Sequence, residues 1–314
     1  MNVRLFSHND TDGYGPKVLL NLIPEIITES SHHTYETINI ATEKFLEAEE
    51  YKHFDYVFFT DISLSETVAK KINNLPGIER HKFFLFDHHA TAIWMRKYSW
   101  AKIADEEEKT CGTKIFHEFL LQFTKKHGFY KGHENLEKQI VYDYVESIRL
   151  YDTWEWTLVN EQVLNKYKPV DHNTLRFILG PHKYEARMTK KLIESDVFDW
   201  DDAERFLLEV EKDKRQDYLE KKLKSMQIIR FEGYKAAYVF AENYQSDLGS
   251  YIMENNKENI DLVIIITAPV KISLRTNKES VDVSILAKKY GGGGHKYAAG
   301  FSFTKENLLK IISS

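Results

Sequence analysis

Two short stretches in the first third of the chain consist of apolar and aromatic residues alone: YVFF at residues 56–59 and FFLF at residues 83–86. A strand that is apolar on both faces must be buried on both, which is typical of a parallel sheet covered by helices. Between the two stretches, Ser65 can cap a helix that runs to Leu75, before Pro76 and Gly77 break it. This order of strand, helix and strand predicts an α/β fold built on a parallel sheet.

Each predicted strand runs directly into acidic and histidine residues. The stretch at 56–59 continues as TD, the strand predicted over 81–86 continues as DHH, and the strand predicted over 3–6 continues as SHNDTDG. We expect the last of these to be extended, so that alternate side chains project to one side, before a helix from about Tyr14 to Leu22. Ligands of an open parallel sheet bind beyond the carboxyl ends of its strands, so the clusters should converge there. The converging side chains would be His8, Asp10, Asp12, Asp61, Asp87, His88 and His89.

Taken one at a time, these clusters have ordinary explanations, such as a polar turn, a calcium-type loop or the approach to a helix. Three of them at the ends of three strands are harder to explain in this way. Carboxylates packed closely in a poorly solvated site repel one another unless cations lie between them. Imidazole together with carboxylate suits manganese, cobalt or zinc. The pattern therefore favours a metal site.

The remainder of the chain predicts a second α/β region. A helical pattern covers residues 110–156, and a long amphipathic helix that connects two domains is expected over about 201–231. Beyond it, strands are predicted at 236–240, 262–267 and 270–274, and helices at 246–255, at 284–290 and from Lys305 on. We divide the chain into a catalytic domain at 1–190, a helical connector at 191–232 and a C-terminal domain at 233–314.

Composition limits the classes of partner. The 314 residues are 42% hydrophobic, which is enough for about two domains. A net charge of −5 argues against a protein that grips long duplex DNA, but it leaves room for a short nucleotide substrate. The longest apolar run, Leu262–Ile266, is far shorter than the ~18 residues of a membrane helix. Cys111 is the only cysteine, so intramolecular disulfides are impossible and a cytoplasmic location is expected.

The motifs resemble those of a known family. HNDTDG at 8–13, Asp61 and DHH at 87–89 resemble the first three motifs of the DHH phosphoesterase superfamily, and Asp152 in LYDTW resembles its fourth. GGGGHKYAAGF at 291–301 resembles the glycine-histidine signature of the small domain that accompanies many members, and SLRT at 273–276 resembles the Arg-containing strand of that domain. The resemblance spans Arg4 to Phe303.

This resemblance implies an architecture and a set of metal ligands. A large parallel-sheet DHH domain and a smaller α/β domain would be joined by a long helix, with the active site in the cleft between them. Two divalent ions would activate a water molecule for in-line attack on phosphorus, with Mn²⁺ first and Co²⁺, Mg²⁺ or Zn²⁺ as alternatives. Asp87 and His89 would orient ligands or substrate, so that Asp87, His88 and His89 form the catalytic motif. The implied ligands are His8 and Asp10 for one ion, Asp12, His88 and Asp152 for the other, and Asp61 for both.

The small domain would bind the substrate phosphate. Backbone N–H groups of Gly292, Gly293 and Gly294 can approach a phosphate closely, and Arg275 and His295 would add charged donors. Residues 270–314 contain eight Lys or Arg against three Asp or Glu, so this segment is basic within an acidic chain. The residues implied to bind substrate are therefore on a segment that favours an anion.

The resemblance is greatest to the nano-RNase branch, and within it to the B type. It implies hydrolysis of short single-stranded oligonucleotides to mononucleotides. A 3',5'-bisphosphate nucleotide phosphatase and a RecJ-like single-strand exonuclease stay open as alternatives, and a nucleotide-binding sensor without activity is a remote one. The sequence also leaves open the polarity of digestion, the preference for RNA or DNA, and whether the protein forms a homodimer.

Three other features receive no role in the chemistry. His32 and His33 are expected in a polar loop, and His117 is interpreted as a structural residue on a helix. Cys111 has no catalytic partner nearby in the sequence, so we interpret it as a packing residue.

Overall fold

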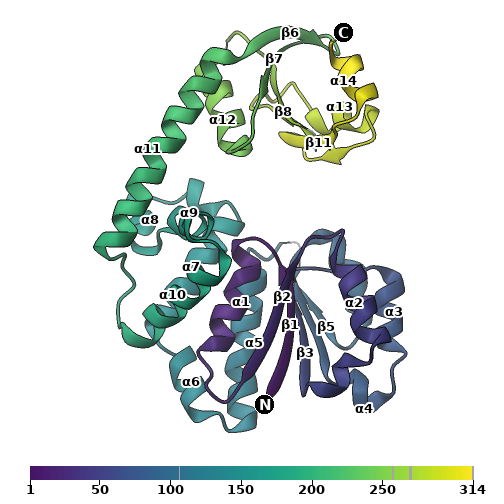
Figure 1. Ribbon diagram of the computed structural model, residues 1–314, viewed down its shortest axis with the longest axis vertical. Helices are drawn as coiled ribbons and strands as arrows, with labels where there is room; N and C mark the ends of the chain where they lie inside the picture. The colour runs from purple at the N-terminus through teal and green to yellow at the C-terminus, as the bar shows by residue number, and fades with distance from the viewer. Residues whose placement is uncertain (106, 257, 269–270, 313–314) are drawn as a thin grey trace. The chain divides into compact units, whose positions relative to one another are not determined.

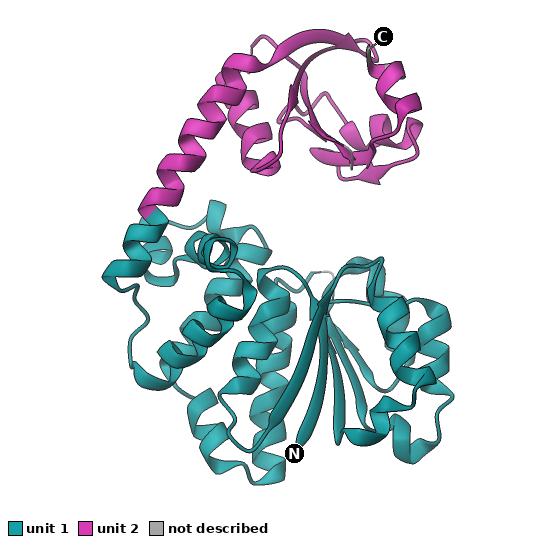
Figure 2. Ribbon diagram, viewed as in Figure 1, with its two compact units in different colours: residues 1–208 teal, residues 209–314 magenta. Residues whose placement is uncertain are grey.

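The structure is a computed structural model that describes residues 1–105, 107–256, 258–268 and 271–312. The chain divides into two units, Met1–Leu208 and Glu209–Ser314 (Figure 2). The division falls within one long helix, α11 (Asp202–Ser225). Each unit is an α/β structure with its own sheet, as expected from the sequence.

The first unit is built on a five-stranded sheet in which all neighbouring strands are parallel. The strand order is β2-β1-β3-β4-β5, so the three strands predicted from the sequence lie side by side in its centre (Figure 1). The carboxyl ends of these strands therefore meet at one edge of the sheet. The strands are β1 (Asn2–His8), β2 (Ile27–His33), β3 (Tyr56–Thr60), β4 (Phe83–Asp87) and β5 (Ala101–Ile103).

Helices cover both faces of this sheet, which explains why its central strands are apolar throughout (Figure 1). Successive residues of β3 enter different cores: Phe58 belongs to the core that contains Phe116 of α5, whereas Phe59 belongs to the core that contains Ile72 of α3. Phe58 and Phe59 are both fully buried. The helices of this unit are α1 (Thr11–Asn21), α2 (Ile38–Glu47), α3 (Glu66–Asn73), α4 (Gly77–Arg80), α5 (Gly112–His127), α6 (Tyr130–Leu136), α7 (Gln139–Asp152), α8 (Glu161–Tyr167), α9 (Pro169–Leu179) and α10 (Pro181–Glu194).

The connection between β1 and α1 differs from the prediction. Instead of an extended segment up to about Tyr14, the chain turns at once, and α1 begins at Thr11. Asp10 is its N-cap and accepts a hydrogen bond from the backbone N–H of Gly13 at 3.0 Å. This hydrogen bond satisfies one of the first N–H groups of the helix, so a helix start directly after the strand is stable. Asp10 itself has the predicted extended backbone, whereas the extended conformation predicted for Asp12 is wrong.

Strand β2 was also missed by the sequence patterns. It contains His32 and His33, which we expected in a loop, and it pairs in parallel with β1, from Asn2 opposite Ile27 to His8 opposite His33. The strand lies at the edge of the sheet and most of its side chains are partly exposed. Its sequence, ITESSHH, therefore lacks the apolar pattern that marks the central strands.

The second unit has a six-stranded mixed sheet with the order β10-β11-β9-β8-β7-β6. Only the pair β7 and β8 is parallel among these neighbours. The strands are β6 (Gln227–Phe231), β7 (Tyr234–Phe240), β8 (Leu262–Thr267), β9 (Lys271–Arg275), β10 (Gly293–Gly294) and β11 (Ala298–Ser302), and the helices are α12 (Gln245–Asn256), α13 (Val283–Lys289) and α14 (Lys305–Ile312).

The long helix is shorter than its amphipathic pattern predicted. It ends at Ser225, and residues 227–231 form strand β6, which pairs antiparallel with β7. The sequence QIIRF places β-branched residues where the helical pattern also placed apolar ones, so periodicity could not separate the two structures. Val270, which was predicted to open a strand, lies outside the described residues. Among the helices that the structure describes, none is long and apolar enough to cross a membrane.

Candidate metal centre

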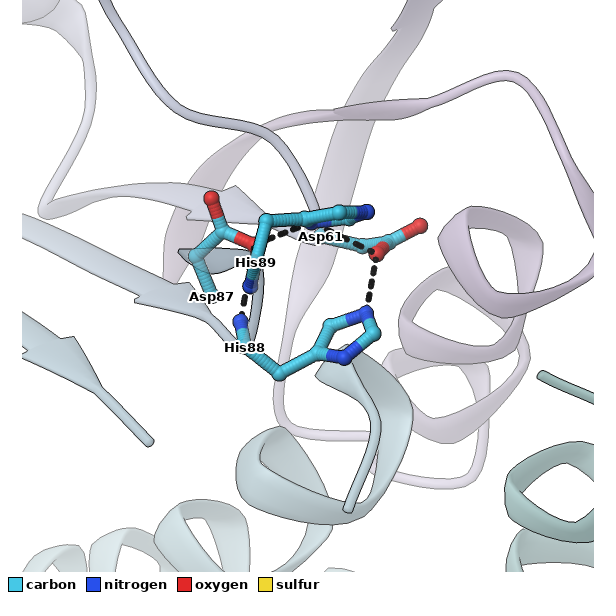
Figure 3. A group of neighbouring side chains, drawn as sticks. All are labelled: Asp61, Asp87, His88 and His89. Carbon is cyan, nitrogen blue, oxygen red and sulfur yellow. Dashed lines mark hydrogen bonds and ion pairs between the residues drawn. The ribbon is translucent and has the colours of Figure 1, made fainter. Parts of the chain in front are cut away.

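The carboxyl ends of β3 and β4 bring four predicted site residues together (Figure 3). Asp61 directly follows β3, Asp87 ends β4, and His88 and His89 come next in the chain. Each residue offers one nitrogen or oxygen atom, and these four atoms all lie within 4.8 Å of one another. The arrangement follows from the parallel pairing of the two strands, in which Thr60 lies opposite Phe86.

Asp61 has an unusual backbone for a non-glycine residue, with φ at 58°. Its N–H nevertheless donates to the carbonyl oxygen of Phe86 at 2.8 Å, which continues the contact between the two strands. A left-handed conformation costs an aspartate energy, so the surrounding structure must hold it there. The result is a carboxylate that is 1% exposed and lies 3.2 Å from Nε2 of His88.

The turn between β1 and α1 supplies a second group of ligand atoms. Nδ1 of His8 lies 2.7 Å from Oδ2 of Asp10 and 3.6 Å from Oδ2 of Asp61. The turn is tight because Gly13 has no side chain: a Cβ there would lie 2.1 Å from the carbonyl oxygen of His8. His8, Asp10 and Asp61 form one set whose ligand atoms could share a cation.

A third group joins residues from three different elements. Nε2 of His88 lies 3.4 Å from Oδ2 of Asp152, the last residue of α7, and 3.8 Å from Oδ2 of Asp12, in the first turn of α1. Asp12, His88 and Asp152 also form a set that could hold a cation. The two ligand sets implied by the family resemblance are thus each gathered in one place, with Asp61 beside both.

The start of α5 fixes the orientation of Asp12. The N–H groups of Gly112 and Thr113 donate to its two carboxylate oxygens at 2.6 and 2.8 Å. The positive end of the helix dipole favours a carboxylate at this position. Gly112 is required because a Cβ there would lie 2.7 Å from Cβ of Asp61 and 3.0 Å from Oδ2 of Asp12. No local pattern of the sequence indicates this contact, because Gly112 and Asp12 are 100 residues apart.

The carboxylates of the centre repel one another. Burial, followed by the charges of Asp12 and Asp10, raises the pKa of Asp61 well above its usual value. Burial, followed by the charges of the same two aspartates, also raises the pKa of Asp152 to about 8. Carboxylates held this closely are stabilised in the charged form by a nearby cation.

Asp87 and His89 form a separate pair at the edge of the centre. Oδ1 of Asp87 accepts hydrogen bonds from the N–H groups of His88 and His89, and it lies 2.7 Å from Nδ1 of His89. Burial lowers the pKa of His89, but the hydrogen bond to Asp87 and the surrounding carboxylates outweigh this effect and raise it to about 9. Asp87 therefore orients its two neighbours and favours the imidazolium form of His89.

Two buried oxygen atoms test whether these residues fit a metal ion. Oδ2 of Asp61 and Oδ2 of Asp87 have no hydrogen-bond partner among the described residues. A buried carboxylate oxygen without a partner is costly, and coordination to a cation satisfies it. Together with the mixed imidazole and carboxylate donors, the oxygen of Asp61 shows that the residues fit a divalent metal ion.

Two residues near the centre carried no signal in the sequence. The ring of Tyr35 lies 5.4 Å from that of His8 and 6.0 Å from that of His89. Nε of Arg176, on α9, donates to Oγ1 of Thr11 at 3.1 Å, and Thr11 stands between Asp10 and Asp12 in the chain. Arg176 thus connects α9 to the start of α1, beside the predicted ligands.

The predicted phosphate-binding residues lie on the sheet of the second unit. Arg275 ends β9, opposite Ala298 of β11, and Gly293 and Gly294 form the short strand β10. Among the predicted phosphate donors Gly292, Gly293 and Gly294, only Gly293 would accept a Cβ without a contact within 4 Å. A Cβ on Gly292 would lie 2.1 Å from the carbonyl oxygen of Gly300, and Gly294 has φ at 139°. Gly292 and Gly294 are thus required by the fold itself.

His295 lies in the turn that joins β10 to β11. Its backbone N–H donates to the carbonyl oxygen of Ala298 at 2.8 Å, and the N–H of Ala298 donates back to His295 at 3.2 Å. The residue is exposed. Its backbone is thus fixed by the turn while its side chain faces solvent.

Three of the residues without an assigned role make packing contacts or hydrogen bonds within unit 1. Cys111 is fully buried in a hydrophobic core, as predicted. His117 is also buried, as expected of a structural residue, and Nε2 of its ring lies 3.0 Å from the carbonyl oxygen of Leu136. The ring of His32 stacks on Tyr14 at 3.7 Å.

Comparison with known proteins gives one close curated relative. The chain is 31% identical to the oligoribonuclease NrnB of Bacillus subtilis over 306 residues, which are 96% of this chain and 73% of that protein. The profile of the DHHA1 domain matches residues 233–314.

Several solved structures have a similar fold. RecJ from Thermus thermophilus, in complex with Mn²⁺, matches 99% of this chain and 51% of its own with a TM-score of 0.54 and 16% identity. The DHH domain of a member of the s1p family of ribosomal proteins matches 99% of this chain and 85% of its own, with a TM-score of 0.59 and 15% identity. At these identities the likeness concerns the fold.

Proposed function

The chain belongs to the DHH phosphoesterase family and is a phosphoester hydrolase that acts on nucleic acids, and we propose that it hydrolyses short oligonucleotides to mononucleotides with two divalent metal ions. One observation supports the proposal above all others. Every side chain that the resemblance implies as a ligand lies in one of three adjoining sets whose ligand atoms are within 4.8 Å of one another. The relative with which the chain shares 31% identity is itself an oligoribonuclease.

The proposed ligands divide between two ions. His8 and Asp10 would hold one ion, Asp12, His88 and Asp152 the other, and Asp61 would contact both, since it lies near His8 and near His88. When bound, two such ions supply Lewis-acid stabilisation of phosphoryl charge and make a water molecule more acidic. The donor set of imidazole and carboxylate suits Mn²⁺, as well as Co²⁺ or Zn²⁺.

The chain itself would position and neutralise the substrate. Nδ1 of His89 is engaged by Asp87, so its Nε2–H is the donor that we propose for a phosphoryl oxygen. The hydrogen bond to Asp87 raises the pKa of His89, which favours this protonated form. In the second unit, Arg275, the N–H of Gly293 and the side chain of His295 are the proposed phosphate donors.

Removal of the metal tests the proposal. Protein treated with a chelator and then dialysed should have lost hydrolysis of a dinucleotide, and Mn²⁺ should restore it. Asp61→Asn should lower kcat/KM at least about 100-fold, since the change removes charge next to both ions. Asp213→Asn, at an exposed position on α11, is the matched control and should behave as the unchanged protein. Full hydrolysis in excess chelator would refute the metal requirement.

A further inference from the structure

Three aromatic side chains surround the predicted ligand Asp152 in the sequence. Tyr151 stacks on Trp156 with 6.5 Å between ring centres and 13° between the planes, and Trp156 stacks on Trp154 at 6.1 Å and 30°. The rings thus form a ladder in the order Tyr151, Trp156, Trp154. We refer to these three residues as the aromatic ladder.

The last ring of the ladder is unusually exposed. Trp154 is 62% exposed, although tryptophan is among the most heavily buried side chains on average. Leu158, which follows the ladder in the chain, is 78% exposed as well. A large aromatic surface beside a candidate site is a feature of ligand-binding surfaces rather than of a core.

The backbone at the ladder is held in a single conformation. Trp154 has φ at 60°, a left-handed conformation that is unfavourable for an aromatic residue. Its N–H donates to the carbonyl oxygen of Tyr151 at 3.2 Å, and its own carbonyl oxygen accepts from the N–H of Thr157 at 3.1 Å. These contacts at the end of α7 fix the direction in which the indole leaves the backbone.

A network of charged residues supports the same segment from α7. Arg149, which is 9% exposed, pairs with Glu155 and donates to both carboxylate oxygens of Glu146 at 2.6 and 2.9 Å. The hydroxyl of Thr153 donates to Glu155 at 3.2 Å, and Lys109 lies 3.1 Å from the same carboxylate. These groups engage the carboxylate of Glu155, which stands between Trp154 and Trp156, and so constrain the segment that carries the ladder.

The ladder is connected to the metal centre by Asp152 itself. Asp152 lies 3.4 Å from His88 and belongs to the set with Asp12. Trp154 is two residues further along the chain, so its Cα lies within about 7.6 Å of that of Asp152. A molecule whose phosphate lay at the centre would carry its own bases within reach of this surface.

We propose that the aromatic ladder is a nucleobase-binding subsite, in which Trp154 stacks on one base of the oligonucleotide substrate. The proposal rests on the proposed function, because it takes the substrate phosphate to lie at the metal centre. Aromatic rings bind any base through its flat face, so the subsite discriminates little between bases. It gives short oligonucleotides an anchor that does not depend on a long basic track.

The test compares two ligands that differ only in the base. A nucleoside 5'-monophosphate and ribose 5-phosphate carry the same sugar and phosphate, and each is titrated as an inhibitor of dinucleotide hydrolysis and by intrinsic tryptophan fluorescence. Loss of one base stack, at about 1–3 kcal/mol, corresponds to about 5- to 150-fold in affinity. The unchanged protein should prefer the nucleotide by at least about fivefold.

Substitutions of Trp154 separate the effect of its aromatic ring on binding from the effect of its backbone conformation. Trp154→Asn removes the ring but keeps a residue that tolerates positive φ, so the turn should survive. Its preference for the nucleotide should fall to near unity, and Trp154→Phe should restore most of it. Tyr130→Ala removes an 87% exposed aromatic ring on α6 and should leave the preference intact.

The outcomes distinguish this proposal from the proposed function. If Trp154→Asn keeps the preference of the unchanged protein, or if the unchanged protein has no preference, the ladder does not bind bases. Neither result contradicts the proposed hydrolysis of dinucleotides. If the fluorescence titration shows the preference but no dinucleotide is hydrolysed, the subsite stands and the proposed reaction fails.

Discussion

Gly112→Ala should disturb the metal centre without altering any proposed ligand. The added Cβ would lie 2.7 Å from Cβ of Asp61 and 3.0 Å from Oδ2 of Asp12, and real Cβ contacts are almost never below 3.0 Å. The first turn of α5 and the two aspartates must therefore separate. The hydrogen bond from the N–H of Gly112 to Asp12, at 2.6 Å, is the contact most directly affected.

The expected loss of Mn²⁺ affinity follows from the hydrogen bond between Gly112 and Asp12. A hydrogen bond to a charged group contributes about 1.5–3 kcal/mol, which is roughly 10- to 150-fold in an equilibrium constant. We therefore expect Gly112→Ala to weaken Mn²⁺ binding by about 10- to 150-fold. The readouts are calorimetric titration of the metal-free protein and the Mn²⁺ concentration that gives half-maximal hydrolysis of a dinucleotide.

Gly77→Ala is the matched control. Gly77 begins α4, and a Cβ there would meet nothing within 4 Å. The variant should bind Mn²⁺ as the unchanged protein does. If Gly112→Ala also binds Mn²⁺ with unchanged affinity while both variants are folded by circular dichroism, the contact with α5 does not hold Asp12 in place for a metal ion.

Three further predictions concern Arg176, His172 and the glycines at the phosphate-binding turn. Arg176→Met removes the hydrogen bond to Thr11 and should lower kcat/KM about tenfold, with partial recovery in Arg176→Lys; unchanged kinetics in both would exclude a positioning role. Burial lowers the pKa of His172 from 6.5 to about 3, so the unfolded state binds the proton first and stability falls as the pH drops from 6.5 towards 3. In urea unfolding followed by tryptophan fluorescence, the unchanged protein should lose about 2.5 kcal/mol more than His172→Gln between pH 7 and 4.5, and equal losses would count against this assignment. Gly293→Val should raise KM with metal binding unchanged, since a Cβ there meets nothing, whereas Gly292→Val should destabilise the second unit in thermal unfolding; an unaltered KM would place the phosphate donors elsewhere.

The central strands could be predicted because burial on two faces leaves a local pattern. Phe58 and Phe59 face different cores, so the strand has no polar side, and the position of Asp61 after it follows directly. Strand β2 left no such pattern because it is an edge strand with partly exposed side chains. After β1 the chain could either continue as a strand or begin a helix, and the capping hydrogen bond of Asp10 favours the helix.

The supporting contacts of the centre could not be predicted because they join distant parts of the chain. Asp12 is held by Gly112 and Thr113, and Arg176 reaches Thr11 from a helix 165 residues further on. Gly112, Thr113 and Arg176 belong to no local motif. Similarly, GGGG at 291–294 suggested three equivalent phosphate donors, whereas packing against Gly300 and the backbone angle at Gly294 separate their roles.

We propose that this chain hydrolyses short oligonucleotides with bound divalent metal ions. The most direct measurement is a length series of 5'-labelled single-stranded oligonucleotides, from two to some tens of nucleotides, with metal-free protein supplied with Mn²⁺. We predict that kcat/KM is highest for about two to five nucleotides, that mononucleotides are released, and that the rate falls for longer strands, since each further nucleotide adds ordering cost and a net charge of −5 opposes a long polyanion. A rate that rises steadily to the longest strands, or cleavage of 3',5'-bisphosphate nucleotides alone, would contradict it.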